Sequence, residues 1–171
     1  MSKMFCFQCQ ETSKNEGCTV RGVCGKTADV ANMQDLLMFL CKGISHYTVR
    51  LREHNVEIAE INKFITDSLF MTITNANFDM NRFIVRMHIA YEMRNAAKER
   101  LMNWGINIED ITYPGAHWVG KTEEEMLDKA IEVGVLATQN EDVRSLRELT
   151  TYGLKGMAAY AEHAYNLKYE D

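Results

Sequence analysis

The sequence contains a single proline, Pro114, in 171 residues. Proline interrupts helices and is common in irregular and strand-rich folds, so its scarcity favours long helices. The sequence also lacks the about 18–20 consecutive apolar residues that span a bilayer, and it reaches its first cysteine before a signal peptide's apolar region could form. These absences predict a cytoplasmic protein with no membrane partner.

Basic residues are not in excess, because 19 Lys and Arg are set against 24 Asp and Glu, for a net charge of −5. Nucleic-acid binding usually requires a basic face, so we expect no nucleic-acid partner. A hydrophobic content of 46% is ordinary for a globular protein. The length suits one domain or two small helical lobes.

Cysteines are few but clustered, with four of the five in the first 24 residues. A disulfide framework would spread them along the chain, so the cluster indicates metal binding or redox chemistry. Four thiolates suit either a zinc ion or an iron–sulfur cluster. The spacing x2/x8/x5 lacks the second Cys-x-x-Cys of a zinc ribbon, which favours iron–sulfur and leaves zinc open. The four loop cysteines are Cys6, Cys9, Cys18 and Cys24.

Residues 1–28 read as an iron–sulfur cysteine loop, the N-terminal loop, because glycine and small polar residues replace any apolar period. Phe5 and Phe7 flank the first cysteine and either shield a cluster from solvent or anchor the loop to the rest of the chain. Backbone N–H groups of such a loop can point inward to sulfur. Cys41 lies in an apolar helical segment and is predicted to be a buried core thiol.

Residues 29–171 read as a helical bundle domain, because apolar residues recur at steps of three and four. The caps are Asp79 for a third helix ended by Gly105, a capping box of Thr122 and Glu125 for a fourth, and Asn140 before a fifth. No segment alternates at period two. The prediction is an all-α fold of about five helices in one or two small up-down bundles, with helices from about 29, at 56–72, at 79–104, at 122–137 and after 140.

Three further features refine this prediction. Residues 72–77 are expected to break the chain between the second and third helices, and residues 106–121 to connect the third to the fourth. Arg94 interrupts an otherwise apolar stripe. The buried face of the third helix is predicted to contain Phe83, Met87, Ala90, Ala97, Leu101 and Trp104.

Residues 35–47 resemble residues 148–160 at a constant offset, and both segments carry a glycine on the apolar stripe, Gly43 and Gly156. Glycine in a helix costs about 1 kcal/mol relative to alanine, so its presence suggests a close approach of another backbone. The repeat indicates either two related bundles or two helices with similar neighbours.

Several blocks of sequence resemble a known family, the hybrid cluster proteins, also called prismane proteins or hydroxylamine reductases. The N-terminal loop carries the most specific blocks, and residues 103–140 are the least diagnostic. The matching blocks are residues 4–12, 17–18, 22–27, 34–37, 42–45, 69–70, 72–79 and 152–164.

This resemblance implies a helical, cytoplasmic oxidoreductase that acts on hydroxylamine or nitric oxide and receives electrons from a donor protein. It implies that the four loop cysteines bind a [4Fe–4S] cubane, because the short spacing is similar to that of the cubane-bearing members and not to that of the [2Fe–2S] members. The hybrid iron–sulfur–oxygen cluster of the family needs further ligands in α/β domains. We expect it only in a longer protein, because Cys41 is the sole cysteine after Cys24.

The chain therefore looks like the N-terminal cubane-bearing helical part of this family, able to transfer electrons but not to complete catalysis. The alternatives are a stand-alone iron–sulfur electron-transfer module and a zinc-stabilised interaction module. In the absence of the α/β domains, an apolar face is expected to be exposed and to favour self-association.

Overall fold

The computed structural model describes residues 4–73 and 76–169. Within these residues there is no strand, and the one element of sheet pairing is an isolated antiparallel bridge between Cys6 and Cys18. The prediction of an all-α fold is confirmed. No helix of the described part is both long and apolar enough to cross a membrane. The helices are α1 (Ala28–Glu53), α2 (Ala59–Met71), α3 (Met80–Asn103), α4 (Glu123–Glu132) and α5 (Glu141–Asn166), with 3-10 turns η1 (Ser13–Asn15), η2 (Pro114–Ala116) and η3 (Val135–Ala137).

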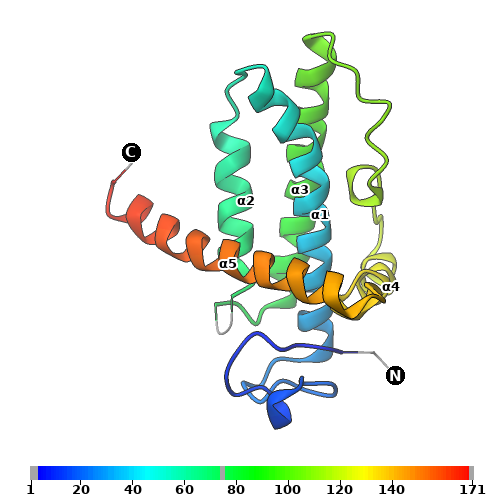
Figure 1. Ribbon diagram of the computed structural model, residues 1–171, viewed down its shortest axis with the longest axis vertical. Coiled ribbons are helices and arrows are strands. Elements are labelled where there is room, and N and C mark those ends of the chain that lie inside the picture. The colour runs from blue at the N-terminus through cyan, green and yellow to red at the C-terminus, as the bar shows by residue number, and fades with distance from the viewer. Residues whose placement is uncertain (1–3, 74–75, 170–171) are drawn as a thin grey trace.

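Helix α1 is the centre of the molecule, and α1, α2 and α3 run alongside one another as an up-down bundle (Figure 1). Thr27 caps α1 by accepting a hydrogen bond from the backbone N–H of Val30. The predicted apolar stripe of α1 is fully buried, as shown by Met33, Ile44 and Leu51. The N-terminal loop lies at one end of this bundle, and α5 crosses the bundle near the same end (Figure 1).

The structure confirms the predicted cap of the third helix and corrects two other details, the start of the second helix and the burial of Trp104. Helix α2 begins at Ala59, three residues later than predicted, and α3 begins after the predicted cap Asp79, which accepts from the N–H of Asn81. Trp104 was predicted to be buried but is 62% exposed, because α3 ends at Asn103 and Gly105 turns the chain away with a positive φ of 68°. Of the predicted break at 72–77, residues 74 and 75 lie outside the described residues.

The fourth helix was predicted to reach Ala137, but α4 ends at Glu132 and residues 135–137 form the separate turn η3. Gly134 separates the two, and its close neighbour is a carboxylate oxygen of Asp35. The predicted capping box is half present. Thr122 accepts from the N–H of Glu125, whereas the Glu125 carboxylate accepts from Lys121 and not from Thr122.

Arg94 interrupts the apolar stripe of α3 and binds the segment 106–121, the predicted connector between the third and fourth helices. Its Nη1 donates to the carbonyl oxygens of Gly115 (3.1 Å) and Trp118 (2.6 Å). From α1, the Tyr47 hydroxyl donates to the carbonyl of Ala116 at 3.1 Å. The connector therefore satisfies its buried backbone carbonyls through side chains of the two longest bundle helices.

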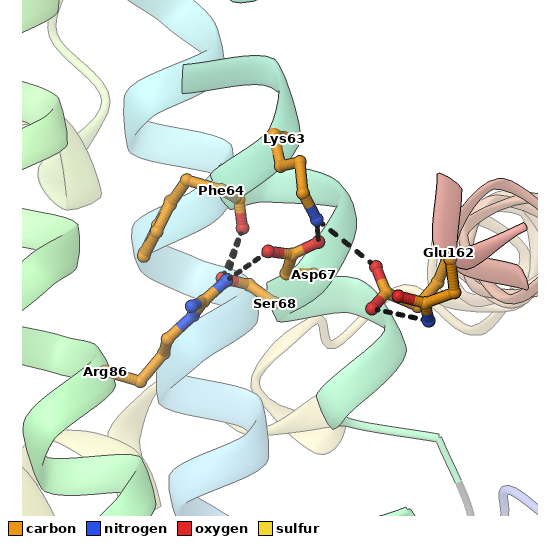
Figure 2. Close-up of polar contacts among 7 residues, drawn as sticks. Lys63, Phe64, Asp67, Ser68, Arg86 and Glu162 are labelled. Atoms are coloured by element: carbon orange, nitrogen blue, oxygen red, sulfur yellow. Dashed lines mark hydrogen bonds and ion pairs between the residues drawn. The ribbon is translucent and has the colours of Figure 1, made fainter. Parts of the chain in front are cut away.

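Helix α5 is joined to the bundle by a chain of charges shown in Figure 2. Arg86 of α3 donates to the carbonyl of Phe64 at 2.9 Å and lies 3.7 Å from Asp67 of α2. Lys63 bridges Asp67 at 2.7 Å and Glu162 of α5 at 3.4 Å. Polar links of this kind fix the position of α5 over α2, although few of its own side chains are buried.

The apolar stripe of α5 lies on its solvent side. Lys155 and Ala158 are the buried residues of this helix, whereas the large apolar side chains are exposed. This agrees with the expectation of an exposed apolar face, and its use for self-association stays a prediction. The exposed apolar residues of α5 are Val143, Leu146, Leu149, Tyr152, Leu154, Met157, Tyr160 and Tyr165.

Candidate metal centre

The N-terminal loop is closed on itself through two of the predicted ligands. The backbone N–H of Cys6 donates to the carbonyl of Cys18 at 3.0 Å, and the N–H of Cys18 donates back at 2.8 Å. The N–H of Gln8 also donates to the Cys6 sulfur, as expected for a loop whose amide groups point inward. These bonds place the first and third cysteines side by side, although they are 12 positions apart in the sequence.

All five cysteines are free thiols. Within the residues that the structure describes, however, no three His, Cys, Asp or Glu side chains gather into a group that could hold a metal ion. The structure thus brings Cys6 and Cys18 together and leaves Cys9 and Cys24 elsewhere in the same loop. The assignment of all four as ligands stays a prediction at this point.

Two glycines of the loop are required by close packing. A Cβ on Gly22 would lie 3.0 Å from the Cys24 sulfur and 3.1 Å from Cβ of Lys26. A Cβ on Gly17 would overlap the ring of Phe5. Contacts of this kind hold the loop compact around its sulfur atoms.

Two buried polar side chains, one at the end of the loop and one in α1, suit an anionic group. Lys26 is 1% exposed, and its Nζ donates to Oε1 of Gln34, a neutral amide, at 2.8 Å. Gln34 is also 1% exposed, and its Nε2 is buried without a hydrogen-bond partner in the described part of the chain. Buried charges and donors are normally matched, so this pair fits a cluster of thiolates and sulfides beside it. The four free thiols are of the donor type that an iron–sulfur cluster needs, and the two polar side chains suit its charge, although the described side chains are not gathered into one metal-binding group.

A cavity of about 840 Å³ lies between the loop, α1, η3 and α5. Cys6 lines it from the loop, Gln34 and Asp35 line it from α1, and Lys155 lines it from α5. The wall is thus charged on the side of α5 and contains sulfur on the side of the loop. The loop therefore borders a partly polar cavity inside the molecule.

The thiols differ in their surroundings. Burial raises the pKa of the Cys6 thiol, while the Gln8 N–H and the positive charge of Lys26 oppose this shift. Cys41 is 4% exposed within α1, and burial raises its pKa to about 12 against a hydrogen bond with Ser68. The prediction that Cys41 is a buried core thiol is confirmed.

Asp35 and Lys155 both line the cavity, and the charge of each acts on the pKa of the other. The pKa of Asp35 is raised to about 7, mainly by burial and also by the negative charge of Glu148, against the attraction of Lys155. The N–H of Val135 and the charge of Lys42 favour the carboxylate and limit this shift. Burial likewise lowers the pKa of Lys155 to about 8, against the attraction of Asp35.

This pair predicts a specific dependence of stability on pH. Between about pH 4 and pH 7 the folded chain holds a proton on Asp35 that an unfolded aspartate has lost, so the free energy of unfolding falls as the pH rises. Above about pH 8 the folded chain has lost the proton of Lys155 that the unfolded chain keeps to about pH 10, so the free energy rises again.

Asp35→Asn should flatten the slope between about pH 4 and pH 7, because the asparagine amide does not titrate. The measurement is urea denaturation of the parent and the variant across this range, at equal metal content. Equal slopes in the two proteins would contradict the assignment to Asp35.

Sequence reasoning missed the polar residues beneath the loop and beside the cavity: Lys26, Gln34, Asp35 and Lys155. One signal was available, because Gln34 and Asp35 interrupt the most apolar part of α1 between Met33 and Leu36. The pairing of these residues with Lys26 and Lys155 is tertiary and has no local pattern.

Comparison with known proteins identifies one family and several similar relatives of this chain. The profile of the Prismane/CO dehydrogenase family matches residues 4–171. The chain is 58% identical over 168 residues to "Hydroxylamine reductase" of Parabacteroides distasonis, which covers 98% of this chain and 30% of that protein. It is 57% identical over 168 residues to "Hydroxylamine reductase" of Clostridium novyi, covering 98% of this chain and 31% of that protein.

A third relative, "Hydroxylamine reductase" of Thermoanaerobacter pseudethanolicus, is 54% identical over 168 residues, with 98% of this chain and 30% of that protein covered. The chain thus spans about 30% of the length of the curated relatives it matches. The family match extends over nearly the whole chain, including the N-terminal loop and all five helices. This chain belongs to the Prismane/CO dehydrogenase family.

Proposed function

We propose that this chain is the N-terminal electron-transfer part of an oxidoreductase of the hydroxylamine reductase type. Its four loop cysteines would bind one [4Fe–4S] cluster. The observation that carries the proposal is the donor set: four free thiols in one short loop, above a buried lysine and an unpaired amide donor. Membership of the family implies iron–sulfur clusters, which supports the choice of metal.

When bound, such a cluster accepts and donates single electrons. The chain's own residues would hold it and control its surroundings. Phe5 and Phe7, whose ring centroids are 5.8 Å apart, flank the first cysteine in the sequence and would limit the access of water to it. The Cys6–Cys18 backbone bridge holds two of the four sulfur-bearing residues side by side.

The reduction of hydroxylamine or nitric oxide would take place elsewhere in the parent protein. After Cys24 this chain offers a single cysteine, Cys41, which is buried in α1 with a strongly raised pKa. A second cluster therefore needs ligands from the part of the relatives that this chain does not match, which we propose to be the α/β domains of the parent. An electron-donor protein and a cytoplasmic location stay predictions.

The test is anaerobic redox cycling of the 171-residue chain. Dithionite should bleach its visible absorbance and a mild oxidant should restore it, while no ammonia accumulates from hydroxylamine. A colourless chain that does not respond to reductant would contradict electron transfer. Catalytic ammonia production by this chain alone would contradict the assignment of the substrate site to other domains.

A further inference from the structure

Lys26 is a buried cation without a buried anion. It is 1% exposed, and among the described residues the ion pairs do not include it. Its Nζ donates to the amide oxygen of Gln34 at 2.8 Å. Because a neutral amide cannot compensate a full charge, the site retains a positive charge beneath the N-terminal loop.

The amide of Gln34 is oriented by two donors. Its Oε1 accepts from Lys26 and from Nε2 of Gln8, at 2.8 Å and 3.2 Å. Both partners are donors, so the oxygen must face them and the Nε2 must face away. That Nε2 is buried and has no hydrogen-bond partner in the described part of the chain. Gln34 therefore holds an unused N–H donor inside the molecule. The residue is among those that line the cavity next to Cys6.

Both groups lie close to the predicted sulfur ligands. The Lys26 stem and the Cys24 sulfur pack on the same face of Gly22, where a Cβ would lie 3.1 Å and 3.0 Å from them. A cation at the end of the loop, Lys26, and an N–H donor in α1, Gln34, thus lie near the loop cysteines.

We propose that Lys26 and Gln34 set the reduction potential of the cluster in the N-terminal loop and shift it to a more positive value. This inference rests on the proposed function. Reduction adds one negative charge to the cluster, and a buried ammonium group stabilises the reduced form more than the oxidised form. A hydrogen bond from Gln34 Nε2 to a thiolate or sulfide acts in the same direction.

The experiment is a redox titration of the anaerobically purified chain, followed by the electron paramagnetic resonance signal of the reduced cluster. Lys26→Met removes the buried charge and keeps the apolar stem, so its midpoint potential should be more negative than that of the parent. Lys26→Arg keeps the charge and should restore most of the potential. Lys14→Met removes an exposed charge from the same loop and should leave the potential unchanged, because water screens it.

Gln34→Glu keeps an acceptor for Lys26 and replaces the unused donor by a carboxylate oxygen, so it should also lower the potential. If the Lys26→Met chain does not assemble a cluster, the potential of Gln34→Glu provides the test of the proposal. A parent chain without a cluster overturns the proposed function, and this inference with it. A parent cluster whose potential is the same in Lys26→Met and Gln34→Glu overturns this inference alone.

Discussion

Replacing any one of the four loop cysteines by alanine is expected to remove nearly all iron and sulfide from the anaerobically purified protein. A [4Fe–4S] cluster needs four thiolate ligands, and alanine offers no donor. The Cys6–Cys18 bridge is made by backbone atoms, so alanine at either position keeps the two hydrogen bonds that close the loop. The loss should therefore come from the missing ligand and not from unfolding. Metal analysis and far-ultraviolet circular dichroism of each variant measure the two effects separately.

Cys41→Ala is the matched control. It removes the same atom from the same chain, but Cys41 lies in the core of α1 among residues that pack against α2 and α3. Its iron and sulfide content should equal that of the parent. Full iron content in one of the four loop variants would show that this cysteine is not a ligand. Loss of iron in Cys41→Ala would show that replacing a cysteine outside the loop has the same effect, and would contradict the assignment of the ligands to the loop.

Gly43→Ala is expected to reduce the free energy of unfolding by about 3 kcal/mol, since overpacking a rigid contact costs on this scale. An added Cβ would overlap the backbone carbonyl of Gly115, and the neighbouring atoms are also backbone. Backbone atoms cannot rotate away as a side chain does. The connector itself is fixed by Arg94 and Tyr47, which bind the carbonyls of Gly115 and Ala116. Urea denaturation of both proteins at one pH gives the difference.

Gly156→Ala is the control that the internal repeat provides. Gly156 occupies the position of Gly43 in the second copy of the repeat, but it is exposed on α5 and a Cβ there would meet nothing within 4 Å. Alanine should therefore stabilise the chain by up to about 1 kcal/mol through its helix propensity. Equal losses from both substitutions would mean that close packing at Gly115 does not explain the effect at Gly43.

Much of the fold could be predicted because it depends on local patterns. The apolar period located α1, α3 and α5. The side-chain caps at Asp79 and Asn140 gave the starting points of α3 and α5 to within a residue or so. Helix α4 was predicted too long because Gly134, a residue that a helix tolerates, instead separates it from a 3-10 turn beside Asp35. Trp104 was misplaced because apolar periodicity does not show where a helix stops.

The candidate site could also be predicted only in part from the sequence. The four loop cysteines stand out in the sequence because their spacing is short and their neighbours are distinctive. The charges around them do not, since Lys26 and Gln34 meet only when α1 forms beneath the loop, and Asp35 meets Lys155 only when α5 crosses the bundle (Figure 1). The repeat of 35–47 in 148–160 predicted a close backbone approach at both glycines. The structure has it at Gly43 and leaves Gly156 open.

The central claim is that the four loop cysteines hold one [4Fe–4S] cluster, and the most direct measurement is the metal and acid-labile sulfide content of the chain purified without oxygen. The claim predicts about four iron atoms and about four sulfides per chain, with no stoichiometric zinc. One zinc per chain with no sulfide would contradict it and would identify the loop as a structural zinc site.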